Sequence, residues 1–221
     1  MAVLVLTISM ILKQIMRKGQ RKTQKKRQAE ASSLFPPSIM PEFQVTSRLR
    51  FRASALLNNV LIFQSDILDL FCMATAANAA YRVMSAARVR SVEIWGPAAA
   101  AGVATVALEW SGTPGNFTGP KQLITDTTLG SSRPAHVYAR APKQSVADMW
   151  FSDGATGGGI FVIDAPQEAI IDVTVDFVVR NSEGAIAVTA ALAAATVGKM
   201  YVRRLDSTTS SLIVPIAMDT I

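Results

Sequence analysis

Eight basic side chains lie within fifteen residues near the start of this 221-residue chain, with no acidic residue among them. They are Lys13, Arg17, Lys18, Arg21, Lys22, Lys25, Lys26 and Arg27. Such a run can neutralise about one phosphate per side chain and release counterions from a polyanion, so binding weakens steeply with salt. The run holds no aromatic side chain, and we therefore expect it to recognise charge and not nucleotide sequence. The alternatives are a nuclear-import signal, which can coexist with nucleic-acid binding, and a solubilising tail.

The excess positive charge of the chain is confined to this basic run. The chain has 22 basic and 16 acidic side chains, and residues 1–30 contain eight of the bases but only one acid, Glu30. The remaining 191 residues therefore carry 14 basic and 15 acidic side chains. A cationic tail on a neutral body is typical of a protein that holds a polyanion with the tail and has another task for the body.

A second group of candidate binding residues lies in an expected strand at Phe43–Ala53. Alternation there puts Val45, Leu49 and Phe51 on one face, and the other face carries Arg48, Arg50 and Arg52. The three arginines either form a solvated sheet face or extend the cationic surface of the basic run. Arg88 and Arg90 are open to the same two interpretations; strict alternation places them on one face with Val92 and Ile94.

Catalytic chemistry has little support in the residue types of this chain. His136 is the only histidine, and its place on a short expected strand is typical of a structural histidine. Cys72 is the only cysteine, so an internal disulfide is excluded, and its apolar neighbours indicate a buried side chain. A zinc site lacks ligands, and Gly157–Gly159 lacks the following Lys and Ser/Thr of a phosphate-binding loop. We expect no enzyme and no cofactor.

Calcium at subunit interfaces is the one metal interaction that the acidic residues leave open. The candidate ligands are Asp126, Asp148, Asp153, Asp164 and Asp172. Aspartates are also common turn and capping residues, which is the alternative for all five.

The first 42 residues are expected to stand apart from the domain that follows. Residues 1–12 are apolar, but they are too short to span a bilayer as a helix and lack the order of charges of a secretory signal. Residues 13–33 are polar and basic, so we expect them to be disordered alone. Pro36, Pro37 and Pro41 then give a stiff connector. We therefore expect an arm and connector at 1–42 and one folded domain at 43–221, with no stable membrane association.

The pattern of the domain is β throughout. Short alternating or apolar runs separated by turn residues predict an all-β sandwich or barrel. We expect two short helices in connections, one capped by Ser65 and one from Ser145 to Trp150, and a loop or frayed helix at 74–80. The expected strands are near 43–53, 59–64, 87–96, 103–111, 135–140, 159–163, 170–180 and 198–204.

Several segments resemble the shell domain of tombusvirus-like capsid proteins, a single jelly-roll lineage also found in some circular single-stranded DNA viruses. The segments are RVRSVEIWGP (88–97), VALEWSG (106–112), DTTLGSSRPAHVYARAP (126–142) and APQEAIIDVTVDFVV (165–179). The resemblance covers about residues 43–205 and rests on the order of arm, proline connector and strands. It implies an eight-stranded antiparallel jelly roll, with the expected strands lettered B to I in order. The short remainder after Arg204 implies a shell without a protruding domain.

The resemblance implies a coat protein that assembles into a non-enveloped icosahedral shell and packages an RNA or single-stranded DNA genome through its basic arm. We expect the chain in the virion, as a homo-oligomer. A monomeric or dimeric β-sandwich that binds nucleic acid is the first alternative, and it should carry aromatic or arginine side chains on a face of the body. A β-scaffold hydrolase and a membrane-anchored domain using residues 1–12 are further alternatives.

Overall fold

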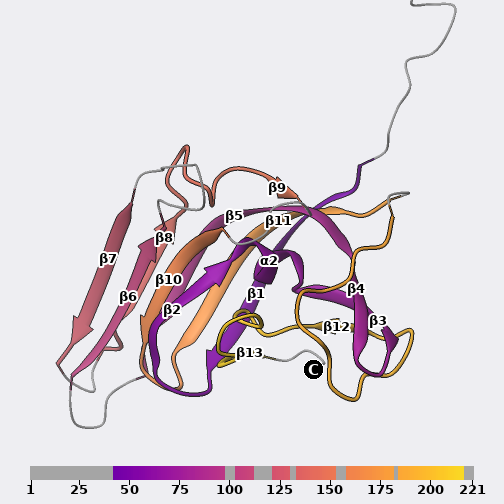
Figure 1. Ribbon diagram of the computed structural model, residues 1–221. Helices are drawn as coiled ribbons and strands as arrows, with labels where there is room; N and C mark the ends of the chain where they lie inside the picture. The colour runs from indigo at the N-terminus through magenta and orange to yellow at the C-terminus, as the bar shows by residue number, and fades with distance from the viewer. Residues whose placement is uncertain are drawn as a thin grey trace, which may run out of the picture. The chain divides into compact units, whose positions relative to one another are not determined.

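The computed structural model describes residues 42–97, 103–111, 121–129, 133–152, 158–181 and 184–216 (Figure 1). The basic run, the proline connector and residues 1–12 lie outside the described residues. The compact unit begins at Glu42.

Two antiparallel sheets form the body of this unit. Sheet A has the order β13–β1–β11–β5–β8, with β9 also paired to β5; sheet B has the order β2–β10–β6–β7. The strands of sheet A are β1 (Gln44–Ala53), β5 (Met84–Trp95), β8 (His136–Arg140), β9 (Phe151–Ser152), β11 (Ile170–Val179) and β13 (Ile213–Pro215). Those of sheet B are β2 (Leu57–Phe63), β6 (Ala104–Trp110), β7 (Gln122–Thr128) and β10 (Gly159–Ala165).

The way the chain crosses between these sheets is that of a jelly roll. If the eight main strands are lettered B to I along the chain, sheet A reads B–I–D–G and sheet B reads C–H–E–F. The predicted fold class, an all-β antiparallel jelly-roll sandwich, is therefore confirmed.

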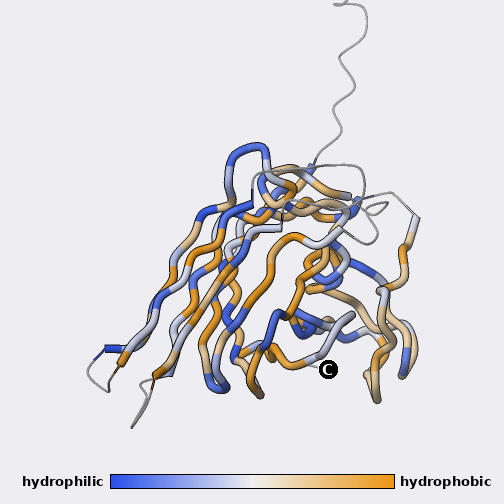
Figure 2. Tube along the Cα trace, turned by 60° about the vertical axis from the view of Figure 1, so that its left-hand side comes forward, coloured by the Kyte–Doolittle hydropathy of each residue, from blue (hydrophilic) through white to orange (hydrophobic). Residues whose placement is uncertain are grey.

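The core lies between the two sheets and follows from alternation along the strands. Leu49 and Phe51 of β1 are buried, and the arginines between and beside them are exposed. Sheet B contributes Trp110 and Phe161, whose rings meet edge to face with centroids 5.6 Å apart. Figure 2 shows hydrophobic and hydrophilic positions alternating along the strands. This two-residue period turns each strand's polar side away from the core.

The predicted lettering of the last four strands is wrong, because β7 was not among the expected strands. Its residues, QLITDTT, are mostly polar, and it pairs with β6 alone as the last strand of sheet B. The expected strands at 135–140, 159–163 and 170–180 are therefore G, H and I. The last expected strand, 198–204, lies outside both sheets, and only Met200–Val202 of it forms a strand, β12.

A third, smaller sheet has the order β12–β3–β4, with β3 at Phe71–Ala76 and β4 at Ala79–Arg82. It replaces the loop or frayed helix predicted at 74–80. The run of alanines has low strand propensity, but pairing with β12 and a small core override it. That core contains Cys72, which is buried as predicted, together with Ala74, Ala80, Leu192, Ala195 and Tyr201.

The described residues contain one helix, α2 (Gln64–Leu68). Phe63, not Ser65, is its N-cap, and Asp66 accepts hydrogen bonds from the Phe63 and Thr208 backbone nitrogens at 3.0 and 2.8 Å. The helix predicted from Ser145 is a turn, although the Ser145 hydroxyl does accept from the Asp148 nitrogen at 3.3 Å. No helix among the described residues is both long and apolar enough to cross a membrane.

Candidate nucleic-acid interface

The arginines predicted as candidate binding residues lie on the outer face of sheet A. Strand pairing places their side chains in transverse rows with those of the neighbouring strands. The rows are Thr46–Asp176–Arg88; Arg48–Thr174–Ser91–Arg140; Arg50–Asp172–Glu93–Tyr138; and Arg52–Ile170–Trp95–His136. We call the surface made by these rows and by Arg90 the arginine face.

A bulge in β5 explains how Arg88 and Arg90 both reach this face. The pairing of β5 with β11 shifts between Thr174 and Val175. Ser91 pairs with Thr174 and Val89 pairs with Val175, so Arg90 between them has no paired position on β11. Strict alternation, which grouped the two arginines with Val92 and Ile94, is therefore wrong. Val92 and Ile94 are buried in the core instead. A bulge adds one residue to a strand and so shifts the alternation beyond it.

Asp172 anchors two of the predicted arginines. It accepts from Arg48 Nε at 2.8 Å, and from Arg50 Nε and Nη2 at 2.7 and 2.9 Å. Its carboxylate is 3% exposed, while the Arg48 and Arg50 side chains are each 54% exposed. Arg48 also donates to Glu93 Oε2 at 2.7 Å. The buried carboxylate thus fixes two guanidinium groups at the surface, where further N–H donors can meet an anion.

Asp176 anchors Arg88 and Arg90 in the way that Asp172 anchors Arg48 and Arg50. Arg88 Nη2 donates to Asp176 Oδ2 at 2.8 Å, Arg90 Nε donates to the same oxygen, and the Thr46 hydroxyl donates to Oδ1 at 2.8 Å. Burial raises the pKa of Asp176, but the hydrogen bonds from Arg88, Thr46 and Arg90 outweigh it, so the pKa lies below its ordinary value. Asp176 therefore stays ionised and keeps both arginines in place.

The arginine face keeps a positive excess after these pairings. Its six arginines are Arg48, Arg50, Arg52, Arg88, Arg90 and Arg140, and the carboxylates bonded to them are Glu93, Glu168, Asp172 and Asp176. Arg52 pairs with Glu168 at 3.3 Å, and both side chains are half-exposed. The predicted arginines Arg48, Arg50 and Arg52 are thus both structural ion-pair partners and surface cations. Their contact with nucleic acid stays a prediction.

Aromatic side chains that were not among the predicted site residues lie among these cations. Tyr138 is 49% exposed, and Arg140 Nε donates to its hydroxyl at 3.3 Å. This bond lowers the pKa of Tyr138. Trp150 is 41% exposed, with the Arg88 guanidinium 4.9 Å from its ring centroid. Such rings provide stacking surfaces for bases. The alternation of β8, which points Tyr138 away from Val137, was the signal that could have found Tyr138.

His136 lies at the edge of the same face as a structural partner. Its Nε2 lies 2.9 Å from Glu93 Oε1, and its ring stacks on Trp95 with centroids 5.3 Å apart. These contacts are those of a packed, hydrogen-bonded histidine, in line with the structural role predicted for it.

The aspartates considered for calcium are spread over the fold. Asp172 bonds the two arginines, Asp126 accepts from the His136 backbone nitrogen at 2.8 Å, and Asp164 accepts from the Asn59 nitrogen. Asp148 lies in the turn after Ser145, and Asp153 is outside the described residues. Within the described part of the chain, no three His, Cys, Asp or Glu side chains are placed to hold a metal together. A calcium ion shared between subunits would take ligands from more than one chain, so it stays a prediction.

The outer face of sheet B has the opposite electrostatic character. Its four strands contain no lysine or arginine, and Glu109 and Asp164 lie at outward positions. Asp126 pairs in register with the buried Val106 and faces inward. Its exposed positions on β7 and β6 include Leu123, Thr125, Thr127 and Thr105. The sandwich therefore has one cationic sheet face and one that is neutral to acidic.

No protein-family model and no curated protein sequence matches the chain. Solved capsid structures from virus particles are similar to it. A chain of the virus-like particle of extra small virus from the giant freshwater prawn Macrobrachium rosenbergii matches with TM-score 0.42 and 13% identity, over 67% of this chain and 86% of that one. Mud crab tombus-like virus matches with TM-score 0.31 and 10% identity, over 67% and 87%. The semi-empty particle of M. rosenbergii nodavirus matches with TM-score 0.30 and 9% identity, over 66% and 98%.

Proposed function

We propose that this chain is a viral coat protein that assembles with copies of itself into a closed shell and packages nucleic acid. The arginine face and the basic run together contact the genome, and the jelly-roll body forms the shell. The protein is a structural component of the virion and not an enzyme. The genome is RNA or single-stranded DNA.

The observation that carries this proposal is the division of charge between the two sheets. Sheet A carries the six arginines of the arginine face, whereas the strands of sheet B carry none. The basic run is joined through the proline connector to Glu42, directly before β1 of sheet A. The basic run thus precedes the strand that carries Arg48, Arg50 and Arg52 in the sequence. In a shell, this division of charge would turn the cations toward the genome and the less charged face toward solvent.

Exposed apolar side chains give the body surfaces for contact with further copies. Met200, Met73 and Tyr81 are paired in register across β12, β3 and β4, and each is about half exposed. Leu123 and Leu129 are exposed on and beside β7. Apolar surface of this kind favours association. Each contact between jelly rolls can be weak, because every subunit of a shell makes several contacts at once.

The experiment is to purify the full chain after expression with cellular nucleic acid and to image it by electron microscopy, with nuclease treatment in parallel. We expect closed particles tens of nanometres across that protect nucleic acid. In a variant with all eight side chains of the basic run changed to Gln, we expect particles that are empty, irregular or absent. Wild-type protein that stays monomeric and free of nucleic acid contradicts the proposal.

A second candidate function is a monomeric or dimeric β-sandwich that binds nucleic acid. It is favoured by Tyr138 and Trp150, half-exposed aromatic rings set among arginines on one face of the body. Light scattering separates the two functions: a binding module stays at one or two copies on a short oligonucleotide, whereas a coat protein forms large assemblies.

A further inference from the structure

A pocket at one end of the arginine face has the features of a site for a single flat ring. It is an open pocket of about 430 Å³, lined by Glu42, Gln44, Ser85, Ala86, Trp150, Ser152 and Val178. This volume falls in the range of about 300–1,000 Å³ that is usual for small-molecule sites.

The floor of the pocket is one more transverse row of sheet A. Gln44, Val178, Ala86 and Ser152 are paired in register across β1, β11, β5 and β9. Val178 and Ala86 are small, so the centre of this floor is flat and apolar. The Ser85 hydroxyl donates to the Val178 carbonyl oxygen at 3.3 Å and ties β5 to β11 beneath the pocket. A floor of small apolar side chains leaves room for a planar ring beside the Trp150 side chain.

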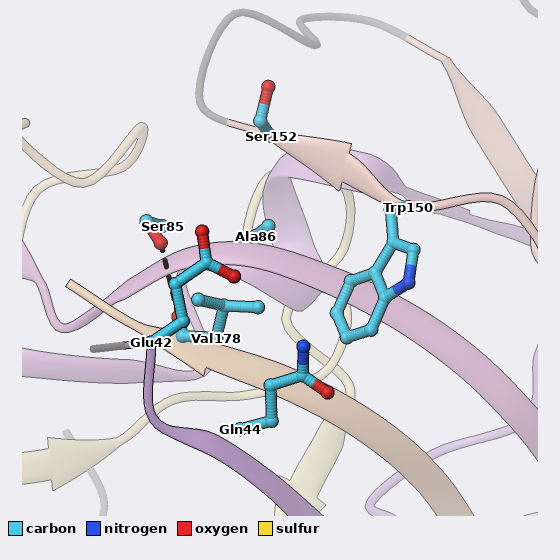
Figure 3. Close-up of a pocket in the computed structure, with 7 residues that line it drawn as sticks. All are labelled: Glu42, Gln44, Ser85, Ala86, Trp150, Ser152 and Val178. Atoms are coloured by element: carbon cyan, nitrogen blue, oxygen red, sulfur yellow. Dashed lines mark hydrogen bonds between the residues drawn. The ribbon is translucent and has the colours of Figure 1, made fainter. Parts of the chain in front are cut away.

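The walls combine an aromatic ring with polar groups. Figure 3 shows the Glu42 carboxylate close to Val178 on one side of the pocket and the Trp150 ring on the other, with the Gln44 amide between them lower in the view. The indole can stack on a ring that enters the pocket. Glu42 accepts hydrogen bonds only, whereas the Gln44 amide can both donate and accept. The edge groups therefore favour a ring that presents N–H donors.

The cations of the arginine face begin one row away. Arg88 lies over the Trp150 ring, and Arg88 and Arg90 share Asp176, which leaves two guanidinium groups on one carboxylate. A negatively charged group attached to the ring in the pocket would meet this pair. A flat ring with amino groups, joined to a phosphate, is a nucleotide.

We propose that this pocket binds one unstacked nucleobase of single-stranded nucleic acid, in particular a base with an exocyclic amine, while Arg88 and Arg90 contact its phosphate. The inference rests on the proposed function and adds a base-reading site to it. Stacking on Trp150 supplies affinity for any base. The Glu42 carboxylate favours the amine of cytosine over the carbonyl oxygen that uracil has in its place.

The test compares five-residue oligonucleotides of cytidine and uridine, which have the same backbone charge. Binding to the full-length protein is measured at an ionic strength that suppresses the contribution of the basic run. We expect the cytidine oligomer to bind at least about fivefold more tightly than the uridine oligomer. The change Trp150→Ala should weaken cytidine binding by about fivefold or more, and Trp150→Phe should restore most of it.

Two further variants keep the test independent of the fold around Trp150. Glu42→Ala changes an exposed side chain, and we expect it to remove the preference for cytidine without weakening uridine binding. Tyr138→Ala removes another exposed ring from the same face, and it should leave the cytidine-to-uridine ratio unchanged.

Equal affinity of the wild type for both oligomers overturns the proposal. Unchanged oligonucleotide binding by the Trp150→Ala protein also overturns the proposal. If that variant binds oligonucleotides normally but disturbs particle assembly, the pocket receives a protein segment and not a base. Failure of the proposed function looks different, because the wild type then binds no polynucleotide even at low salt.

Discussion

Arg50 forms a two-pronged ion pair with Asp172, with Nε to Oδ1 at 2.7 Å and Nη2 to Oδ2 at 2.9 Å, between directly paired positions of β1 and β11. The carboxylate is buried and the guanidinium is half-exposed. Because Asp172 also holds Arg48, one buried acid orients two surface cations. Buried carboxylates therefore hold the arginines of this face in place. Replacing one of these carboxylates would change the net charge of the face.

Replacing this anchor should raise affinity for nucleic acid while it lowers stability. In Asp172→Asn, Arg48 and Arg50 lose the buried negative charge between them. Arg48 keeps its ion pair with Glu93, whereas the half-exposed Arg50 guanidinium becomes free to bind phosphate. We expect unfolding free energy to fall by about 1–3 kcal/mol. Affinity for a single-stranded oligonucleotide should rise, with a salt dependence steeper by about one phosphate contact. Denaturant titration and binding at several salt concentrations measure the two effects.

Glu168→Gln is the matched control for that variant. It frees Arg52 from a pair in which both side chains are 52% exposed, so little burial is involved. We expect a stability change of less than about 1 kcal/mol and a similar steepening of the salt dependence. If neither variant changes oligonucleotide binding, the arginine face does not contact nucleic acid.

The basic run should set most of the salt dependence of binding. Changing Arg21, Lys22, Lys25, Lys26 and Arg27 to Gln removes five positive charges. For single strands, each lost phosphate contact should reduce the slope of log affinity against log salt by about 0.7, or about 3.5 for all five. Fluorescence anisotropy with a labelled oligonucleotide measures the slope. A slope equal to that of the wild type would show that the run is not the contact.

Asp176 should make the fold sensitive to acid. Its pKa is lowered in the folded state because the hydrogen bonds from Arg88, Thr46 and Arg90 outweigh burial. A carboxyl group of this kind contributes stability that is fully present above its unfolded pKa of about 3.9 and is lost as the pH falls through the folded value. Asp176→Asn should therefore be less stable at neutral pH and should lose less stability between about pH 5 and pH 3. If the melting temperatures of the wild type and Asp176→Asn fall by the same amount over this pH range, the prediction is contradicted.

Tyr138 should titrate at a lower pH than an ordinary tyrosine. The hydrogen bond from Arg140 favours the phenolate and lowers the pKa of Tyr138. Absorbance at the phenolate band during an alkaline titration should show an early component. Tyr138→Phe should remove that component, and Arg140→Met should move it to higher pH. An early component that survives Tyr138→Phe belongs to another residue.

The sequence predicted the fold class and the strand β1 because their patterns are regular. In β1, arginines alternate strictly with core residues such as Leu49 and Phe51, and this periodicity identified both the strand and its cationic face. β7 was missed because an edge strand needs little apolar surface, and its polar, threonine-rich residues show no clear apolar alternation. One missed strand then displaced the lettering of the four expected after it.

The candidate site was predictable only where the alternation is unbroken. The bulge at Arg90 depends on the pairing of β5 with β11, which local sequence does not encode. The partners Asp172 and Asp176 lie more than 80 residues away from the arginines they hold. The pocket beside Trp150 is likewise assembled from four strands that are distant in sequence.

The two faces of the sandwich can be compared directly by cysteine labelling of assembled particles. Cys72, the only native cysteine, is fully buried and gives a low background. Ser91→Cys places a thiol on the arginine face, and Thr125→Cys places one on the outer face of sheet B. A bulky maleimide is added to intact particles and, in parallel, to dissociated subunits of each variant. We expect Thr125→Cys to react equally in both and Ser91→Cys to react only after dissociation. Reaction of Ser91→Cys in intact particles, with Thr125→Cys protected, would contradict an arginine face turned toward the genome.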